Sequence, residues 1–219
     1  MEILSLSNKH LLFQDHLPDW DLNVHVILGK QFHYLIDTGL GSGSMLPIKP
    51  YLYLEPKPII VINTHHHWDH VWGNHTFDNT PIVSHTLCPE LIQQRWNLML
   101  DKNRQYVHGE VKMSLPNITF EDQLYFPNDK IRIFYTPGHT IDSISIFDEE
   151  EGILNAGDNI GDTIIEPVPS IEVDLDIYRN TLHLYQTLPV QKCISGHNQV
   201  LDADVFRKIE QLLSHKLST

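Results

Sequence analysis

The chain has 219 residues, of which 41% are hydrophobic, so it is long enough to bury a sizeable core. Its 28 acidic residues outnumber its 15 basic ones, and the formal net charge of −13 argues against a partner as anionic as a nucleic acid. Cys88 and Cys193 are too few for a disulfide framework, and no run reaches the ~18 apolar residues of a membrane span. The first residues also lack a signal-peptide pattern, so we expect a cytoplasmic protein with no membrane partner.

Short runs rich in β-forming residues open the chain, and we predict strands at residues 3–6, 11–13, 24–28 and 32–36. Gly29 and Lys30 form the expected hairpin turn between the last two. Trp20 lies in the loop over residues 14–23, where packing on the sheet is its expected role. Residues 41–44 are rich in glycine, but they lack the spacing of a phosphate or dinucleotide loop, so we expect only a flexible link there.

The next strand, predicted at residues 58–62, leads into the segment Thr-His-His-His-Trp-Asp-His. Imidazole nitrogens and carboxylate oxygens are ligands that zinc and similar divalent metals accept. So short a loop cannot direct all of its donors at one ion, and alternation along an extended segment places His66 opposite to its two neighbours. The pattern therefore indicates two neighbouring metals, with the candidate ligands His65, His67, Asp69 and His70.

The rest of the first half is a predicted strand at residues 81–84, a helix at about 89–100, and a polar segment at 101–116 that is a candidate lid. Strands then resume at residues 118–120, 124–126, 131–135, 143–147 and 152–156. Two helices, at about 174–188 and 202–217, close the chain, with a strand at 191–195 between them.

The His-x-His-x-Asp-His motif resembles the signature of the metallo-β-lactamase-fold hydrolases, and its wording is most similar to that of glyoxalase II. The family's three further ligands have candidates in Thr-Pro-Gly-His139, Ala-Gly-Asp158 and Ser-Gly-His197, each at the end of a predicted strand. By resemblance, His65, His67 and His139 hold one metal, Asp69, His70 and His197 hold the second, and Asp158 bridges both. Asp37, after an earlier strand, would fix the metal loop without binding metal, although an Asx turn before Gly39 explains it equally well.

The alternation of strands and helices indicates an α/β or α+β protein. The resemblance implies, more specifically, a four-layer αββα sandwich. No linker rich in Pro, Gly or Ser separates two domains, so we expect a single domain over residues 1–219 with two similar halves, at about 1–116 and 117–219.

The resemblance also implies the chemistry, which is that of a hydrolase with two Zn²⁺ ions per chain, Fe or Mn being possible instead. A metal-bridging hydroxide would attack the acyl bond of a small-molecule thioester, ester, lactone or related substrate. Asp69 and Asp158 are the expected catalytic residues, and Asp69 would pass a proton to the leaving group. The loops at residues 14–23, 101–116 and 159–173 are the candidates for contacting the substrate.

Four other interpretations compete with this one. A His-rich loop can arise by chance or bind one structural metal, but structural zinc sites are usually rich in cysteine, and four motifs in order favour the hydrolase. A mononuclear iron persulfide dioxygenase would use His65, His139 and Asp158 as a facial triad. Glyoxalase II itself carries a further basic helical segment that binds glutathione. This chain continues for only 22 residues after His197, so we expect glyoxalase II to be a poor fit. A nuclease is disfavoured by the net negative charge.

Overall fold

The computed structural model describes residues 1–161 and 163–216. It consists of two compact units, Met1–Glu121 and Asp122–Thr219. This division lies five residues beyond the predicted boundary between the halves. That the halves belong to one domain stays a prediction.

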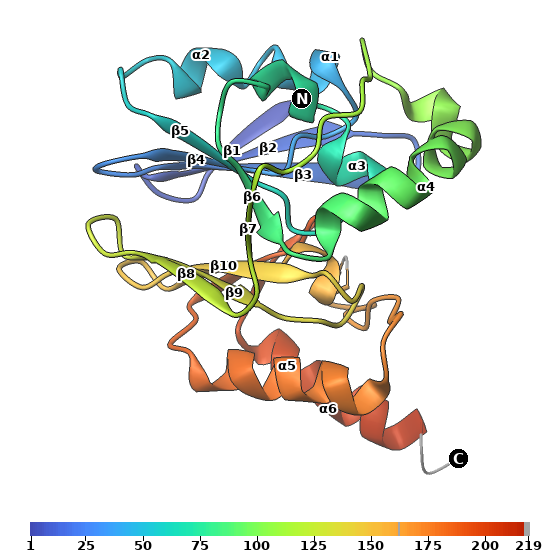
Figure 1. Cartoon of the computed structure of the whole chain (residues 1–219). Helices are drawn as coiled ribbons and strands as arrows, with labels where there is room; N and C mark the ends of the chain where they lie inside the picture. The colour runs from blue at the N-terminus through green and yellow to red at the C-terminus, as the bar shows by residue number, and fades with distance from the viewer. Residues whose placement is uncertain (162, 217–219) are drawn as a thin grey trace. The chain divides into compact units, whose positions relative to one another are not determined.

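Unit 1 is built on a seven-stranded sheet in which the strands follow one another in chain order (Figure 1). The first four strands are antiparallel, and β4 to β7 then run parallel. The inner strand β5 has the sequence Ile-Ile-Val-Ile and is buried throughout, as expected for a parallel strand covered on both faces. The strands are β1 Glu2–Ser5, β2 His10–His16, β3 Asp21–Leu28, β4 His33–Ile36, β5 Ile59–Ile62, β6 Ile82–His85 and β7 Ile118–Phe120.

Two short helices, α1 Ser42–Met45 and α2 Lys49–Leu52, cover one face of this sheet (Figure 1). Met45 and Leu52 pack there against Phe13 and Leu35 of the strands. The prediction of a flexible link at residues 41–44 is therefore wrong. Its glycines permit close packing, because a Cβ on Gly43 would collide with the ring of His108.

The segment at residues 101–116, predicted to be a poorly ordered candidate lid, is helical in its first part, and its second part is docked on unit 1. Helix α4 runs over Cys88–Asn103, and a 3₁₀ turn continues it over Arg104–Tyr106. The chain beyond lies against the α1 turn, where the amides of Ser42 and Gly43 donate to the carbonyls of Glu110 and His108. This segment is therefore ordered and docked, and its role as a lid stays a prediction.

Unit 2 contains, in its described residues, a six-stranded sheet in the order β13-β12-β11-β10-β9-β8. Only β11 and β12 pair in parallel. The strands are β8 Gln123–Phe126, β9 Ile131–Tyr135, β10 Ile144–Asp148, β11 Ile153–Asn155, β12 Lys192–Ile194 and β13 Val200–Asp202. Strand β13 was not predicted, since residue 202 was expected to begin a helix.

Helices α5 Leu175–Thr187 and α6 Asp204–Lys216 lie side by side across one face of this second sheet (Figure 1). Tyr178, Leu182 and Tyr185 recur at helical spacing and are buried against the strands. The predicted end of the last helix, residue 217, lies outside the described residues. None of the described helices is long and apolar enough to cross a membrane.

Candidate metal centre

The His-rich loop of unit 1 begins directly after β5 and leads into the one-turn helix α3 Trp68–Val71. His67 is extended, with φ −65° and ψ 151°, but residues 64–66 before it form bends, so the segment is not the regular extended run from which the alternation was predicted. The ligand atoms of His65 and His67 lie within 4.8 Å of each other, as do those of Asp69 and His70. His66 belongs to neither convergence within the described chain.

Asp37 holds this loop in place, as the resemblance implied. Its carboxylate accepts hydrogen bonds from the amide and the hydroxyl of Thr64, both at 2.8 Å, and lies 2.8 Å from Nδ1 of His70. The backbone of Asp37 is left-handed, at φ 63°, a conformation that Asp tolerates better than most residues and that recurs at functional sites. The carboxylate therefore fixes the orientation of the metal loop.

These contacts also select the tautomers of two histidines. His70 donates its Nδ1–H to Asp37, which leaves the Nε2 lone pair available. The hydroxyl of Thr64 uses its hydrogen on Asp37, so it accepts from Nδ1 of His65 at 3.0 Å and leaves Nε2 of His65 available as well. Both rings are thus oriented, before any metal binds, as ligating histidines usually are.

A second hydrogen-bond network, which sequence reasoning missed, supports the His-rich loop. The side chains of Asn63 and Asn74 exchange two hydrogen bonds, of 2.8 and 3.0 Å, and Asn63 and Thr38 both donate to the carbonyl of His70. Trp72 is fully buried and packs against Val71 and against Cys88, Ile92 and Trp96 of helix α4. The His-rich loop is therefore held both by hydrogen bonds to its backbone and by the packing of Trp72.

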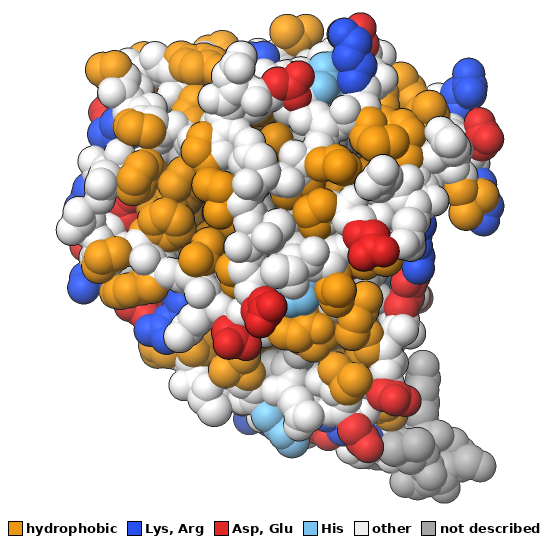
Figure 2. Space-filling model, in the orientation of Figure 1, with side chains coloured by type: hydrophobic (Ala, Val, Ile, Leu, Met, Phe, Trp, Pro, Cys, Tyr) orange, Lys and Arg blue, Asp and Glu red, His pale blue; other side chains and the backbone are white. Residues whose placement is uncertain are grey.

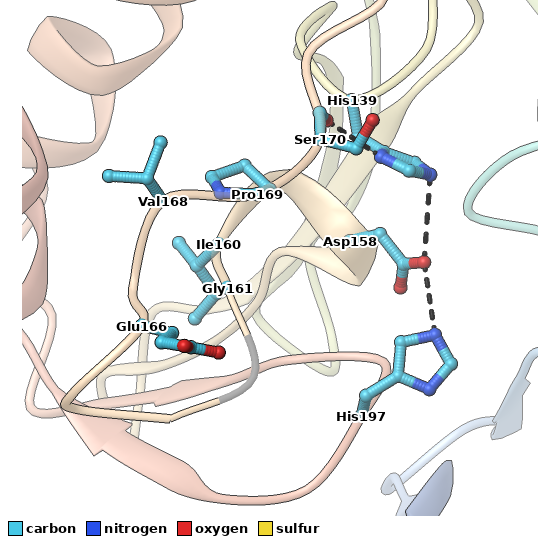
Figure 3. A pocket seen from close by; sticks show the side chains of 9 residues that line it. All are labelled: His139, Asp158, Ile160, Gly161, Glu166, Val168, Pro169, Ser170 and His197. Atoms are coloured by element: carbon cyan, nitrogen blue, oxygen red, sulfur yellow. Dashed lines mark hydrogen bonds and ion pairs between the residues drawn. The ribbon is translucent and has the colours of Figure 1, made fainter. Parts of the chain in front are cut away.

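In unit 2, His139, Asp158 and His197 come from three different strand ends and meet at one point (Figure 3). Oδ2 of Asp158 lies 3.1 Å from Nε2 of His197 and 3.7 Å from Nε2 of His139. His139 donates its Nδ1–H to the carbonyl of Ser170 at 2.9 Å, which again leaves Nε2 as the ligating atom. The structure thus brings together the three residues that sequence analysis found separately.

Asn159, which sequence analysis did not single out, joins the loops that carry His139 and Asp158. Its Oδ1 accepts from the amide of His139 at 2.7 Å, and its Nδ2 donates to the hydroxyl of Tyr185 at 3.0 Å. This approach requires glycine at position 138, because a Cβ there would lie 2.5 Å from Oδ1 of Asn159. Burial raises the pKa of Tyr185 to about 12, so its hydroxyl stays neutral at physiological pH.

A cavity of about 270 Å³ opens beside these three residues, and the predicted substrate loop at 159–173 forms much of its wall. Ile160, Val168 and Pro169 supply an apolar side, and the carboxylate of Glu166 lies at its edge (Figure 3). Residue 162 of this loop lies outside the described part of the chain. The cavity suits a small group of modest polarity.

The donor sets of the two units fit divalent metal ions. Unit 1 offers three imidazoles and one carboxylate, and unit 2 offers two imidazoles and one carboxylate. This mixture of nitrogen and oxygen donors without a thiolate is typical of catalytic zinc, iron or manganese sites. Of these seven side chains, five are oriented by the tautomer-selecting contacts or the direct ion pairs described above.

A model of the metallo-beta-lactamase superfamily matches residues 17–197 of the chain. The chain belongs to this superfamily. Its fold is also that of the solved structure of TMB-1, with a TM-score of 0.77 at 15% identity over 100% of this chain and 98% of the other. The predicted mixed α/β fold with two sheets and the predicted superfamily are thereby confirmed.

Curated members of the superfamily also match at low identity. The lactamase-like protein adaB of Aspergillus niger is 27% identical over 201 residues, which are 90% of this chain and 55% of that protein, so the chain spans about half of its length. The acyl-coenzyme A thioesterase MBLAC2 of Homo sapiens is 24% identical over an alignment of 233 positions that covers 90% of this chain and 82% of the relative. The superfamily is one of hydrolases that act on small molecules, while the closer likeness to glyoxalase II stays a prediction.

Proposed function

We propose that this protein is a dinuclear metal-dependent hydrolase that cleaves an acyl bond, with thioesters as its first candidate substrates. The observation that carries the proposal is the way in which hydrogen bonds orient three of the histidines. His65, His70 and His139 each have Nδ1 in a hydrogen bond, which leaves Nε2 as the unprotonated nitrogen, although they lie on two units and two different loops. This hydrogen-bonding pattern is typical of histidines that bind a metal ion through Nε2.

The ligand assignment within the proposal is the one that the family motif implies. His65, His67 and His139 would hold one ion, Asp69, His70 and His197 would hold the other, and Asp158 would be shared. Bound zinc would supply a water that ionises near neutral pH and would polarise the acyl carbonyl. Asp69, 6% exposed beside His70, would then carry a proton to the departing group.

The thioester preference draws support from two observations. The matching human protein is described as an acyl-coenzyme A thioesterase. The cavity beside His139 and Asp158 also has the apolar wall that an acyl chain needs. Its volume of about 270 Å³ favours short acyl groups over long ones.

A substrate panel tests this proposal. The zinc-loaded protein should hydrolyse short acyl-coenzyme A thioesters faster than S-lactoylglutathione, a homoserine lactone or a β-lactam, and a chelator should abolish the activity. A protein that hydrolyses none of the four classes, or that hydrolyses them equally well without metal, would overturn the proposal. Rapid turnover of S-lactoylglutathione would instead restore the glyoxalase II assignment.

A further inference from the structure

A second cavity, of about 190 Å³, lies in unit 1 between the metal loop and helix α4. We call it the α4 pocket. His67 and Trp68 line it from the loop, and Arg95, Leu98, Met99 and Lys102 line it from the helix. Because His67 is a proposed metal ligand, a molecule in this pocket would have one end at the reaction centre.

The charge of the α4 pocket is opposite to that of the whole chain. The chain has a net charge of −13 and only 15 basic residues, yet two of these line this one pocket, and none of its lining residues is acidic. Arg95 and Lys102 are seven residues apart, which places them on one face of the helix about 10 Å apart along its axis. Figure 2 shows basic, acidic and hydrophobic side chains over this helix, so the absence of acidic residues holds for the pocket lining and not for the whole helix surface.

The wall opposite the two cations is rigid. The ring of Trp68 stacks on Tyr106 at 5.2 Å, and Trp20 and Trp72 contact it at 6.1 and 5.0 Å. A tryptophan held by three aromatic neighbours keeps its position with or without a ligand. The α4 pocket is therefore preformed, which lowers the entropic cost of binding.

The two cavities differ in the charge that they accept. The cavity in unit 2 is edged by Glu166 and contains Asp158, so it repels an anionic group and suits the acyl part of a substrate. The α4 pocket offers a guanidinium and an ammonium, the two side-chain groups that bind carboxylates and phosphates. The α4 pocket therefore suits an anionic group, whereas the cavity in unit 2 does not.

We propose that the α4 pocket binds an anionic group, carboxylate or phosphate, on the leaving thiol of a thioester substrate. The inference rests on the proposed hydrolase function and names its substrate class. In the reaction, water adds to the acyl carbon, the carbon–sulfur bond breaks, and the thiol leaves with a proton while the acyl group becomes a carboxylic acid. Arg95 and Lys102 hold the anionic end of that thiol and take no part in the bond changes.

Two matched substrate pairs test the inference and separate the two sources of charge. The carboxylate pair is the butyryl thioester of 3-mercaptopropionate and that of its neutral amide. The phosphate pair is the butyryl thioester of 4′-phosphopantetheine and that of pantetheine. In at least one pair, the wild type should show a kcat/KM about tenfold higher for the anionic member, in keeping with two charge-assisted contacts at an exposed site.

The double variant R95Q/K102Q should reduce that ratio to about one, and R95K/K102R should restore most of it. The matched control is R104Q/R207Q, which removes the same charge from two exposed arginines that lie in ion pairs with Asp101 and Asp204 outside the pocket. It should keep the wild-type ratio. Circular dichroism of each variant confirms that it is folded.

The outcomes distinguish the inference from the function on which it rests. A wild-type protein that hydrolyses both members of both pairs with equal kcat/KM is a thioesterase without an anion subsite, and the inference is then wrong. A ratio that survives in R95Q/K102Q, or that falls equally in R104Q/R207Q, also overturns it. A wild type that hydrolyses none of the four substrates contradicts the proposed function itself.

Discussion

Asp37 orients ligands without facing the metal position, so its replacement separates orientation from ligation. Asp37→Asn keeps the shape of the side chain but directs an N–H group or a weaker acceptor at Nδ1 of His70. The preferred tautomer of His70 is then lost, and metal affinity should fall about 10- to 100-fold. Competition with a coloured chelator measures this, and an unchanged affinity would mean that the contact does not select the tautomer.

Asp158 and His66 form a matched pair for testing the ligand assignment. Asp158→Ala removes the carboxylate expected to lie between two dications, so their repulsion is no longer offset. The variant should retain clearly less metal and lose at least about 100-fold in activity, the range typical of losing a group that fixes the catalytic centre. His66→Ala should keep both metal and activity, since His66 joins neither convergence of ligand atoms in the described chain.

Metal analysis by mass spectrometry and a hydrolysis assay check both variants together. Loss of metal in the His66 variant alongside full metal content in the Asp158 variant would show that the ligands were assigned to the wrong residues.

The candidate ligands could be found from sequence because their spacing carries the chemistry. His65, His67, Asp69 and His70 lie within six residues, and the single ligands stand in short motifs after predicted strands. Asn159 offered no such signal. Its partners His139 and Tyr185 lie 20 and 26 residues away, and only the folded chain brings them together.

At the scale of elements, strands were predicted best because alternating or wholly apolar runs identify them. Helices of four residues, such as α1 and α2, are shorter than two turns and give no 3.6-residue period. The glycines and serines before Met45 favoured a loop by composition. They form helix α1 instead, and backbone hydrogen bonds to His108 and Glu110 hold its first turn in place. Strand β13 has three residues and precedes a helix directly, so its pattern merged with that of the helix.

Trp72 connects the His-rich loop to helix α4, so removing its side chain should destabilise the packing of both. The ring is fully buried against Val71, Cys88, Ile92 and Trp96. Trp72→Ala should lower the free energy of unfolding by about 3 to 5 kcal/mol, the usual cost of such a cavity. Denaturant unfolding measures this, with the partly exposed Trp20→Ala as the control. An equal loss in both variants would contradict the structural role given to Trp72.

At the scale of the whole molecule, buried tyrosines set an alkaline limit to stability. Burial raises the pKa of Tyr185 to about 12 from an ordinary value of 10.0, and burial raises that of Tyr178 as well. Above pH 10 the unfolded chain releases a phenolic proton that the folded chain keeps, so stability should fall as pH rises, by about 1.4 kcal/mol per pH unit for each such group.

Unfolding free energies measured between pH 9 and pH 11 test this dependence. Tyr185→Phe should be less stable at pH 9, because hydrogen bonds to Ser145 and Asn159 are lost, but its stability should fall less steeply above pH 10. Equal slopes for the variant and the wild type would mean that Tyr185 is not protected from ionisation.

Titration of the metal-free protein with zinc, while hydrolysis of a short acyl thioester is followed, tests the central claim most directly. Two ligand sets that share Asp158 predict that activity rises to a plateau at about two zinc ions per chain. If no thioester is cleaved at any zinc level, while a parallel titration with Fe²⁺ reaches a plateau at one ion per chain with oxygen consumed on a persulfide, the dinuclear hydrolase is contradicted and the dioxygenase is supported.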